Sequence, residues 1–450
     1  MKKLLSIFLG MLFIVIIIND GSGRGNIPTQ EILSGLADAN QEMDIEIDSI
    51  INDKNTIKFN VKSFGAKGDG INNDTQSIQD AINEAATIAG SVIIPEGVYL
   101  VNALESINVK DNVTIIMTPK TVLKAIPNSS SHYAILNITN VKNVRIYGGV
   151  LVGDRSEHLR TDGEWGMGVR IIGSTNVTIK YTKANDCWGD GFYIGGNSYQ
   201  DYCENIRLVN IAANNNRRQG ISLISGRNID IINAVLTNTN GTSPAAGLDI
   251  EPNRVSQIME NINIDNLTSI HNSAGIKIYL RNLSNSERNI NITIRNHRDY
   301  GSKQGFVVSS AGGIVNGKLV IENSEWINAE YNGLVILNHD YKSFEISVIN
   351  PKVCDANQSR SGERARGSAV AVYYSPRFKV SPLNMGNIYI ANLIVHNTLE
   401  TSFIQHGIFI EDITGNSMYN ISIVDPQILA GTKHEKISIQ SSINNFVYEN

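Results

Sequence analysis

The sequence predicts an all-β solenoid, a stack of coils that share one core. The first observation is a phrase of glycine, apolar residue, any residue and apolar residue, whose first seven copies are spaced by 23, 29, 27, 28, 30 and 28 residues. The copies begin at Gly168, Gly191, Gly220, Gly247, Gly275, Gly305, Gly333 and Gly407, with a looser copy at Gly367. A second phrase, asparagine followed by the same apolar pattern, interleaves with the first, as in Asn176-Val-Thr-Ile179. Two short period-two strands in each repeat of roughly 28 residues are typical of a solenoid.

Length and charge agree with this prediction. Because solenoids grow by adding coils, a chain of 450 residues is expected to hold one repeat domain rather than several separate cores. The formal net charge is -5, and no basic stripe of the kind that binds nucleic acid is present. We therefore expect no nucleic-acid partner.

The N-terminus has the pattern of a secretory signal. Lys2 and Lys3 precede an apolar run from Leu4 to Ile18, which is short for a helix that spans a bilayer. We expect residues 1–25 to direct export to the cell surface, periplasm or medium, or to remain as a membrane anchor if they are not cleaved. Residues 26–56 are interpreted as a leader or linker and residues 57–450 as the repeat domain. The sequence leaves the oligomeric state open.

The three cysteines are too few and too widely spaced for a disulfide framework or a Cys-x-x-Cys metal site. Cys187 and Cys203 lie in neighbouring coils and are close enough in the repeat to allow a pair. The interpretation we prefer is that all three, with Cys354, are small buried residues.

The repeat domain opens with a strand, a glycine-rich turn and a helix. Asp74 or Thr75 is expected to cap this helix, which should extend over about residues 74–90. Its apolar positions fall on one face: Ile78, Ala81, Ile82 and Ala85. The strand that starts near Gly90 then enters the first coils.

The block from Phe59 to Val101 closely resembles the start of the pectate-lyase superfamily of right-handed parallel β-helices. That superfamily includes polygalacturonase-like and rhamnogalacturonase-like hydrolases, pectate and alginate lyases, uronate epimerases and phage tailspikes. The resemblance implies a right-handed parallel β-helix from about residue 57 to the C-terminus, with the helix at 74–90 capping its open end. It implies a polysaccharide substrate but no single reaction, because a fold does not fix a function.

The phase of the glycine phrase identifies the side chains that face outward. The apolar pair points into the core, so the residue between its members points out. The resulting outer column holds Arg170, Tyr193, Ser222, Asp249, Lys277, Val307 and Val335, and a second column holds Gly195, Ile224, Glu251, Tyr279, Ser309 and Leu337. We expect these columns to form a continuous outer surface, with polar and ionisable groups gathered on the coils from 168 to 281.

Turns between the strands add further candidates along one edge of that surface. They hold Asp186, Trp188, Asp190, Arg217, Arg218 and His271. A polar excursion at residues 153–166 is expected to overhang the same groove, with Trp165 as a platform on which a sugar stacks. The residues assigned to substrate binding are Trp165, Arg170, Asp186, Trp188, Tyr193, Arg217, His271 and Tyr279.

Asp249 and Glu251 form the centre of the candidate site. They stand two residues apart on one strand, and therefore share a face with Cα atoms about 6.6 Å apart. Two carboxyl groups at such a separation are what cleavage of a glycosidic bond requires, and their charges tend to move their pKa values apart. The alternative is a solvated face on which Asp249 pairs with Lys277.

Three functions follow from these residues. The leading one is a glycoside hydrolase that uses Asp249 and Glu251 with help from Asp190 and needs no cofactor. The second is a lyase or epimerase of uronate polymers, in which Lys277, Arg218 or a tyrosine moves the proton and the acids neutralise the substrate or bind Ca²⁺. The third is a glycan-binding adhesion protein. The Asp-Asp pair and Gly-His-Gly motif of polygalacturonases are absent, so the resemblance transfers no mechanism to this chain.

Overall fold

The computed structural model describes residues 29–53, 55–376 and 383–449. The chain divides into two compact units, residues 1–52 and residues 53–450. The described part of the first unit is one helix, α2 (Thr29–Asn52), in the segment expected to be a leader. The expected signal at residues 1–25 lies outside the described residues, and no helix among the described residues has the length and apolar character needed to cross a bilayer.

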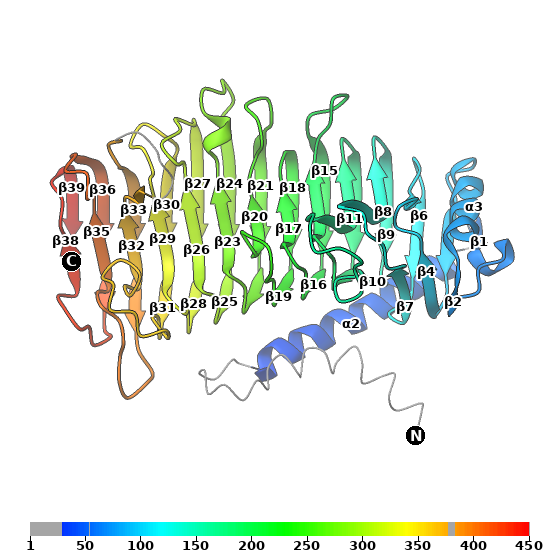
Figure 1. Cartoon of the computed structure of the whole chain (residues 1–450), viewed down its shortest axis with the longest axis horizontal. Helices are drawn as coiled ribbons and strands as arrows, with labels where there is room; N and C mark the ends of the chain where they lie inside the picture. The colour runs from blue at the N-terminus through cyan, green and yellow to red at the C-terminus, as the bar shows by residue number, and fades with distance from the viewer. Residues whose placement is uncertain (1–28, 54, 377–382, 450) are drawn as a thin grey trace. The chain divides into compact units, whose positions relative to one another are not determined.

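The second unit is a parallel β-solenoid of three sheets, A, B and C, which every full coil visits in that order (Figure 1). Within the described residues, sheet A consists of β1 (Lys58–Asn60), β3 (Ser91–Ile94), β6 (Thr114–Met117), β9 (Lys142–Tyr147), β12 (Thr175–Lys180), β15 (Cys203–Val209), β18 (Gly226–Ile232), β21 (Met259–Asp265), β24 (Ile290–Arg295), β27 (Gly317–Glu322), β30 (Glu345–Ile349), β33 (Gly386–Ala391), β36 (Met418–Val424) and β39 (Ile443–Glu449).

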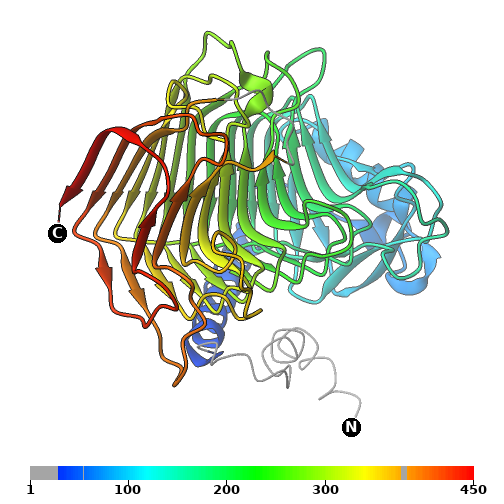
Figure 2. The same cartoon turned by 60° about the vertical axis from the view of Figure 1, so that its left-hand side comes forward.

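Sheet B consists, over the same residues, of β2 (Asp69–Asn73), β4 (Gly97–Val101), β7 (Thr121–Ala125), β10 (Val150–Val152), β13 (Lys183–Asn185), β16 (Ala212–Asn214), β19 (Val235–Thr237), β22 (Thr268–Ile270), β25 (Arg298–Tyr300), β28 (Glu325–Ile327), β31 (Lys352–Cys354), β34 (Ile394–His396) and β37 (Gln427–Ile428). Figure 2 shows these coils from an angle at which the chain can be followed from one sheet to the next.

Sheet C carries the candidate site. Its described strands are β5 (Ile107–Asn108), β8 (His132–Thr139), β11 (Trp165–Ile172), β14 (Asp190–Gly195), β17 (Gln219–Leu223), β20 (Ala246–Ile250), β23 (Ala274–Tyr279), β26 (Gln304–Ser309), β29 (Asn332–Leu337), β32 (Val370–Tyr373), β35 (Ile408–Glu411) and β38 (Ile437–Ile439). Two short 3-10 helices, η1 (Val61–Phe64) and η2 (Arg281–Leu283), lie in connections.

The two repeated phrases have separate physical causes. Glycine recurs on sheet C because a Cβ on Gly191 would lie 2.7 Å from the carbonyl oxygen of Gly220, and one on Gly247 would lie 2.7 Å from that of Gly275. The phrase asparagines sit in left-handed backbone, which asparagine tolerates well. Their amides also bond from coil to coil, as Asn205 does to Asn176 at 2.9 Å.

The predicted core is confirmed. The apolar pair of each glycine phrase is buried, and one apolar cluster runs through the coils from Val61 to Ala430. The three cysteines are free and buried, as the preferred interpretation expected, so Cys187 and Cys203 are not paired.

The helix of the opening block is α3 (Thr75–Ala86), which ends before the expected residue 90. Its predicted apolar face, Ile78, Ala81, Ile82 and Ala85, is buried in the solenoid core. Asp74 stands at the N-cap position but makes no capping bond. Its carboxylate instead accepts from the backbone of Lys67 at 2.6 Å and of Gly68 at 2.9 Å, and so fixes the glycine-rich turn.

Candidate functional site

The predicted outer column exists as one ladder of sheet C. Arg170 lies beside Tyr193, and Tyr193 beside Ser222. The ladder then passes to Asp249 and Lys277. Because neighbouring strands lie about 4.8 Å apart, five coils bring these side chains into one continuous row.

The row is less open than expected. Ser222 and Asp249 have no exposed surface, and neither does Asp190. The expectation that Ser222 and Asp249 lie on a solvent-facing surface is therefore wrong, because neighbouring side chains cover them. The groups of the site that keep part of their surface in solvent are Arg170, Tyr193, Arg218, Glu251 and Lys277. Ligands in solvent meet these groups first.

Asp190 is held by a cation and a hydroxyl. Arg218 Nη1 lies 3.2 Å from Asp190 Oδ2, and Ser222 Oγ donates to the same oxygen at 3.0 Å. Burial nevertheless raises the pKa of Asp190 to about 6, although Arg218 and Ser222 lower it. A carboxyl group with this pKa can gain or lose a proton near neutral pH.

Only one oxygen of the Asp249 carboxyl group has a hydrogen-bond partner among the described residues. Gln219 Nε2 donates to Oδ2 at 3.0 Å, and Oδ1 accepts no hydrogen bond among the described residues. Burial, and then the charge of Glu251, raise the pKa of Asp249 well above its ordinary value, while Lys277 and Arg218 lower it. The shift favours the protonated form of Asp249.

Tyr193 stands three residues after Asp190 on β14 and two coils before Asp249 on the ladder. Burial, followed by the charge of Asp190, raises the pKa of its phenol. The phenol therefore keeps its proton at neutral pH. One coil beyond Asp249, the Lys277 ammonium lies 5.8 Å from the ring centroid of Tyr279.

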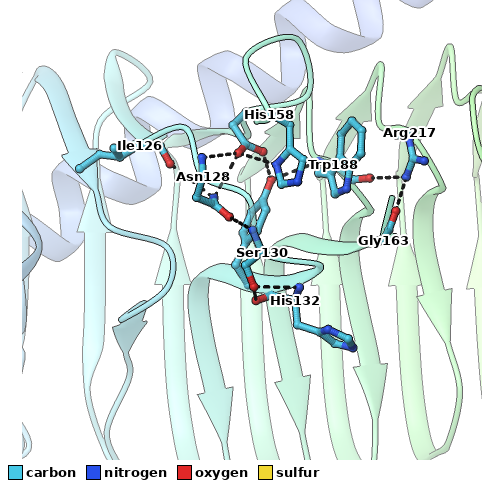
Figure 3. Close-up of polar contacts among 10 residues, drawn as sticks. Ile126, Asn128, Ser130, His132, His158, Gly163, Trp188 and Arg217 are labelled. Atoms are coloured by element: carbon cyan, nitrogen blue, oxygen red, sulfur yellow. Dashed lines mark hydrogen bonds and ion pairs between the residues drawn. The ribbon is translucent and has the colours of Figure 1, made fainter. Parts of the chain in front are cut away.

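The segment 153–166 is fastened by a cluster of polar and aromatic side chains (Figure 3). Asp154, which is fully buried, accepts from the Tyr133 hydroxyl, and His158 Nδ1 lies 2.8 Å from its Oδ2. The His158 ring stacks on Trp188 with centroids 4.1 Å apart. The Arg217 guanidinium lies 3.9 Å from the centroid of the Trp188 ring, and its Nη1 donates to the Gly163 carbonyl at 2.7 Å.

This cluster changes the interpretation of two predicted ligand-binding residues. Trp188 and Arg217 hold the segment in place, and Trp188 is 7% exposed, so a sugar does not reach its ring in this arrangement. His158 was not predicted, although a histidine within a polar excursion is a signal that the sequence offered. What the segment presents instead is Trp165, which is 37% exposed and stacks on His132 with centroids 4.5 Å apart.

Glu164 is a second residue that the sequence analysis missed. One of its carboxylate oxygens lies 4.0 Å from Arg218 Nε. Arg218 thus stands between Asp190 and Glu164, and the segment contributes a charge to the candidate site. Only the fold of the segment brings this residue near the ladder.

Two other predicted residues lie in turns between sheets B and C. Asp186 has left-handed backbone and accepts from Asn215 Nδ2 at 2.5 Å. His271 also has left-handed backbone and directly follows β22. The residues that the structure brings together are Tyr193, Asp190, Arg218, Asp249, Glu251 and Lys277. No group of three or more His, Cys, Asp or Glu suited to a metal ion is found in the part of the chain that the structure describes, and Ca²⁺ stays a prediction.

The sequence model of the family "Rhamnogalacturonase A/epimerase, pectate lyase-like" matches residues 58–334. The chain belongs to this family. Among curated relatives, the uncharacterized protein YclG of Bacillus subtilis is 31% identical over 219 residues, which cover 43% of this chain and 38% of YclG. The match therefore spans well under half of that relative's length.

Two solved structures share the fold. The A-module of the Azotobacter vinelandii mannuronan C-5 epimerase AlgE4 aligns with a TM-score of 0.65 at 18% identity, covering 87% of this chain and all of the module. The family 28 exopolygalacturonase of Yersinia enterocolitica aligns with a TM-score of 0.58 at 12% identity, covering 87% of this chain and 78% of the enzyme. Identities this low establish the architecture and leave the reaction to the site residues.

Proposed function

We propose that this protein is an enzyme that modifies an acidic polysaccharide by proton transfer at the ladder from Tyr193 to Lys277. The observation that carries the proposal is the division of the site into fully buried acids and partly exposed groups. Asp190 and Asp249 are covered, while Tyr193, Arg218, Glu251 and Lys277 keep surface in solvent. Arg218 and Lys277 supply two positive charges, Tyr193 supplies a proton donor and Glu251 supplies a carboxyl group. Two positive charges suit a substrate that carries its own carboxylate.

The chemistry would begin at the carbon that bears the uronate carboxylate. Arg218 and Lys277 would neutralise that carboxylate, which makes the neighbouring C–H more acidic and stabilises the anion formed. Glu251 would accept the proton. Alternatively, a neutral Lys277 would accept it, and Arg218 alone would then neutralise the carboxylate. Tyr193 would then donate a proton either to the opposite face of the carbon, giving the epimer, or to the leaving glycosidic oxygen, giving an unsaturated end.

Hydrolysis, the leading function in the sequence analysis, remains a second candidate because of one observation. Asp249 has a raised pKa beside Glu251, and a neutral acid next to a carboxylate is the combination that glycosidases use. Asp249 has no exposed surface, so a neighbouring side chain would have to move before this acid reached a glycosidic oxygen. The family name and the fold are compatible with both candidates.

Product analysis separates these reactions. The purified chain is incubated in D₂O with polygalacturonate, polymannuronate and a neutral glucan. Proton transfer to or from carbon predicts deuterium at the carbon beside the carboxylate, or ultraviolet absorbance from unsaturated ends, on an acidic polymer only. New reducing ends with neither signal would establish hydrolysis instead. Binding without any product would favour the adhesion protein.

Three further features belong to the proposal. Export follows from the pattern of residues 1–18, and detection of the protein outside the cell with a processed N-terminus would test it.

The right-handed course of the coils follows from the general preference of parallel crossovers. Helix α3 is proposed to cover the first coil, because its apolar face contributes to the same cluster as the first strands.

A further inference from the structure

A polar hollow of about 350 Å³ lies on sheet C four coils before Asp249. It is bordered by helix α3, by β5 and by β8. Its lining is mostly amide and hydroxyl side chains, with one cation and two valines: Gln79, Asn83, Asn108, Val109, Lys110, Asn137, Thr139 and Val141. Nothing in the reaction proposed above uses it.

The amides of the hollow are already oriented. Gln79 Oε1 accepts from the backbone of Asn108 at 2.8 Å, and its Nε2 donates to the Asn108 carbonyl at 3.0 Å. Asn137 Nδ2 donates to Asn108 Oδ1 at 2.8 Å, and Thr139 Oγ1 donates to Asn137 Oδ1 at 2.7 Å. Side chains fixed in this way lose little entropy when they bind a ligand.

The hollow belongs to the same ladder as the candidate site. Asn108 lies beside Asn137, and Asn137 beside Arg170. Arg170 Nη1 also donates to Asn137 Oδ1 at 3.2 Å, which ties the floor of the hollow to the first residue of the site. At ~4.8 Å for each coil, Asn137 lies roughly 19 Å from Asp249, a span of several sugar rings.

We infer that this hollow is a binding site for a remote sugar unit of the acidic polymer, with the uronate carboxylate directed toward Lys110. The inference rests on the proposed function for the identity of the polymer. Sugar hydroxyls both donate and accept hydrogen bonds, as amide side chains do. Lys110 is exposed and forms no ion pair among the described residues, so its ammonium is available to an anion. Val109 and Val141 offer apolar contact to the C–H face of a ring.

Such a site has a consequence for the dependence on chain length. An oligomer long enough to fill both the hollow and the ladder binds more tightly than one that reaches the ladder alone. Because the hollow holds no reacting bond, this gain lowers KM and leaves kcat unchanged. A trimer that occupies the ladder is too short to reach Lys110.

The test compares the full chain with Lys110→Ala on uronate trimers and octamers. The matched control is Lys142→Ala, which removes another exposed lysine, from β9 on sheet A. We expect Lys110→Ala to raise KM for the octamer about fivefold to tenfold with unchanged kcat, and to leave the trimer and the control unaffected. Asn83→Ala, which removes an exposed amide of α3 at the rim, should act in the same direction with a smaller effect.

Equal octamer KM values for the native chain and Lys110→Ala would overturn the inference while the proposed function stands. If no acidic polymer yields a product, the proposed function fails. Titration calorimetry with the same uronate octamers then tests separately whether the hollow binds a sugar unit. Weaker octamer binding by Lys110→Ala than by Lys142→Ala would support the site. Equal affinities, or no binding by the native chain, would overturn it.

Discussion

One ladder of sheet C has two chemically different regions. From Arg170 to Lys277 it carries polar and ionisable side chains, whereas its continuation carries Val307, Val335, Ala371 and Phe409. The strands, their spacing and their parallel pairing are the same in both regions. All four of these side chains are buried, and Val307 and Val335 pack with Ala274 and Leu337 in a separate apolar cluster.

The difference shows where this solenoid places buried charge. In the apolar region the outward side chains carry no charge, so burying them costs little electrostatic free energy. In the polar region Asp190 and Asp249 are equally covered, and each relies on donors from neighbouring coils, namely Arg218, Ser222 and Gln219. Burial of carboxylates opposes stability, so their concentration on a few coils indicates a functional site.

The largest expected effect concerns the exposed proton-transfer groups. Glu251→Gln and Lys277→Ala should each lower turnover roughly 100-fold to 10,000-fold, because each removes a group that accepts a proton or neutralises a carboxylate. The control is Val307→Ala, one coil beyond Lys277 on the same ladder. Steady-state rates on the polymer identified by product analysis provide the measurement. A comparable loss in the control would show that the two regions do not differ in function.

Next is a carboxylate placed in the apolar region. Val335→Asp buries a charge without the donors that serve Asp190, and should lower the free energy of unfolding by about 3–5 kcal/mol. Val335 has no exposed surface, and Val335→Ala, which only removes volume, is the matched control. Thermal unfolding of both variants measures the effect. A stable Val335→Asp protein would mean that donors are not what permits buried acids in this fold.

Another buried carboxyl group, that of Asp299, lets the effect of burial be measured apart from function. It lies in sheet B, away from the ladder, and Ser269 Oγ and Ser302 Oγ each donate to it at 2.6 Å. Burial raises its pKa from 3.8 to about 7. Between these values the folded state holds a proton that the unfolded state has lost, so stability from this group falls as pH rises from 4 to 7.

Asp299→Asn should therefore gain stability over the native chain as pH increases, by about 4 kcal/mol above pH 7. His297, whose pKa burial lowers to about 3, is present in both proteins and largely cancels in the difference. Chemical unfolding at pH 4.5, 6 and 8 gives the comparison, and turnover should not change. A gain that is independent of pH would contradict the shifted pKa.

The smallest expected effect concerns the exposed indole ring of Trp165. Trp165→Ala should weaken oligosaccharide binding about threefold to tenfold with little change in stability, because a sugar ring can pack on the exposed indole. Tyr199→Ala is the control, since that side chain is 89% exposed in a different turn. Calorimetry on a Glu251→Gln background measures both. Unchanged affinity for Trp165→Ala would remove the 153–166 segment from the binding surface.

Much of the fold was predictable because its determinants are local. Period-two apolar pairs and glycines at a spacing near 28 residues determine which side chains face the core, and the register of Tyr193, Ser222, Asp249 and Lys277 follows from counting. The presence of Asp249 and Glu251 on one face required only their separation by two residues.

The environment of those residues was decided by tertiary structure alone. The burial of Asp249, the stacking of Trp188 between His158 and Arg217, and the approach of Glu164 to Arg218 all join segments that lie far apart in the chain. Repeat spacing states which way a side chain points from its strand. It carries no information about which side chains from other segments cover that residue, and it is this burial that removes water from the acids and raises their pKa values.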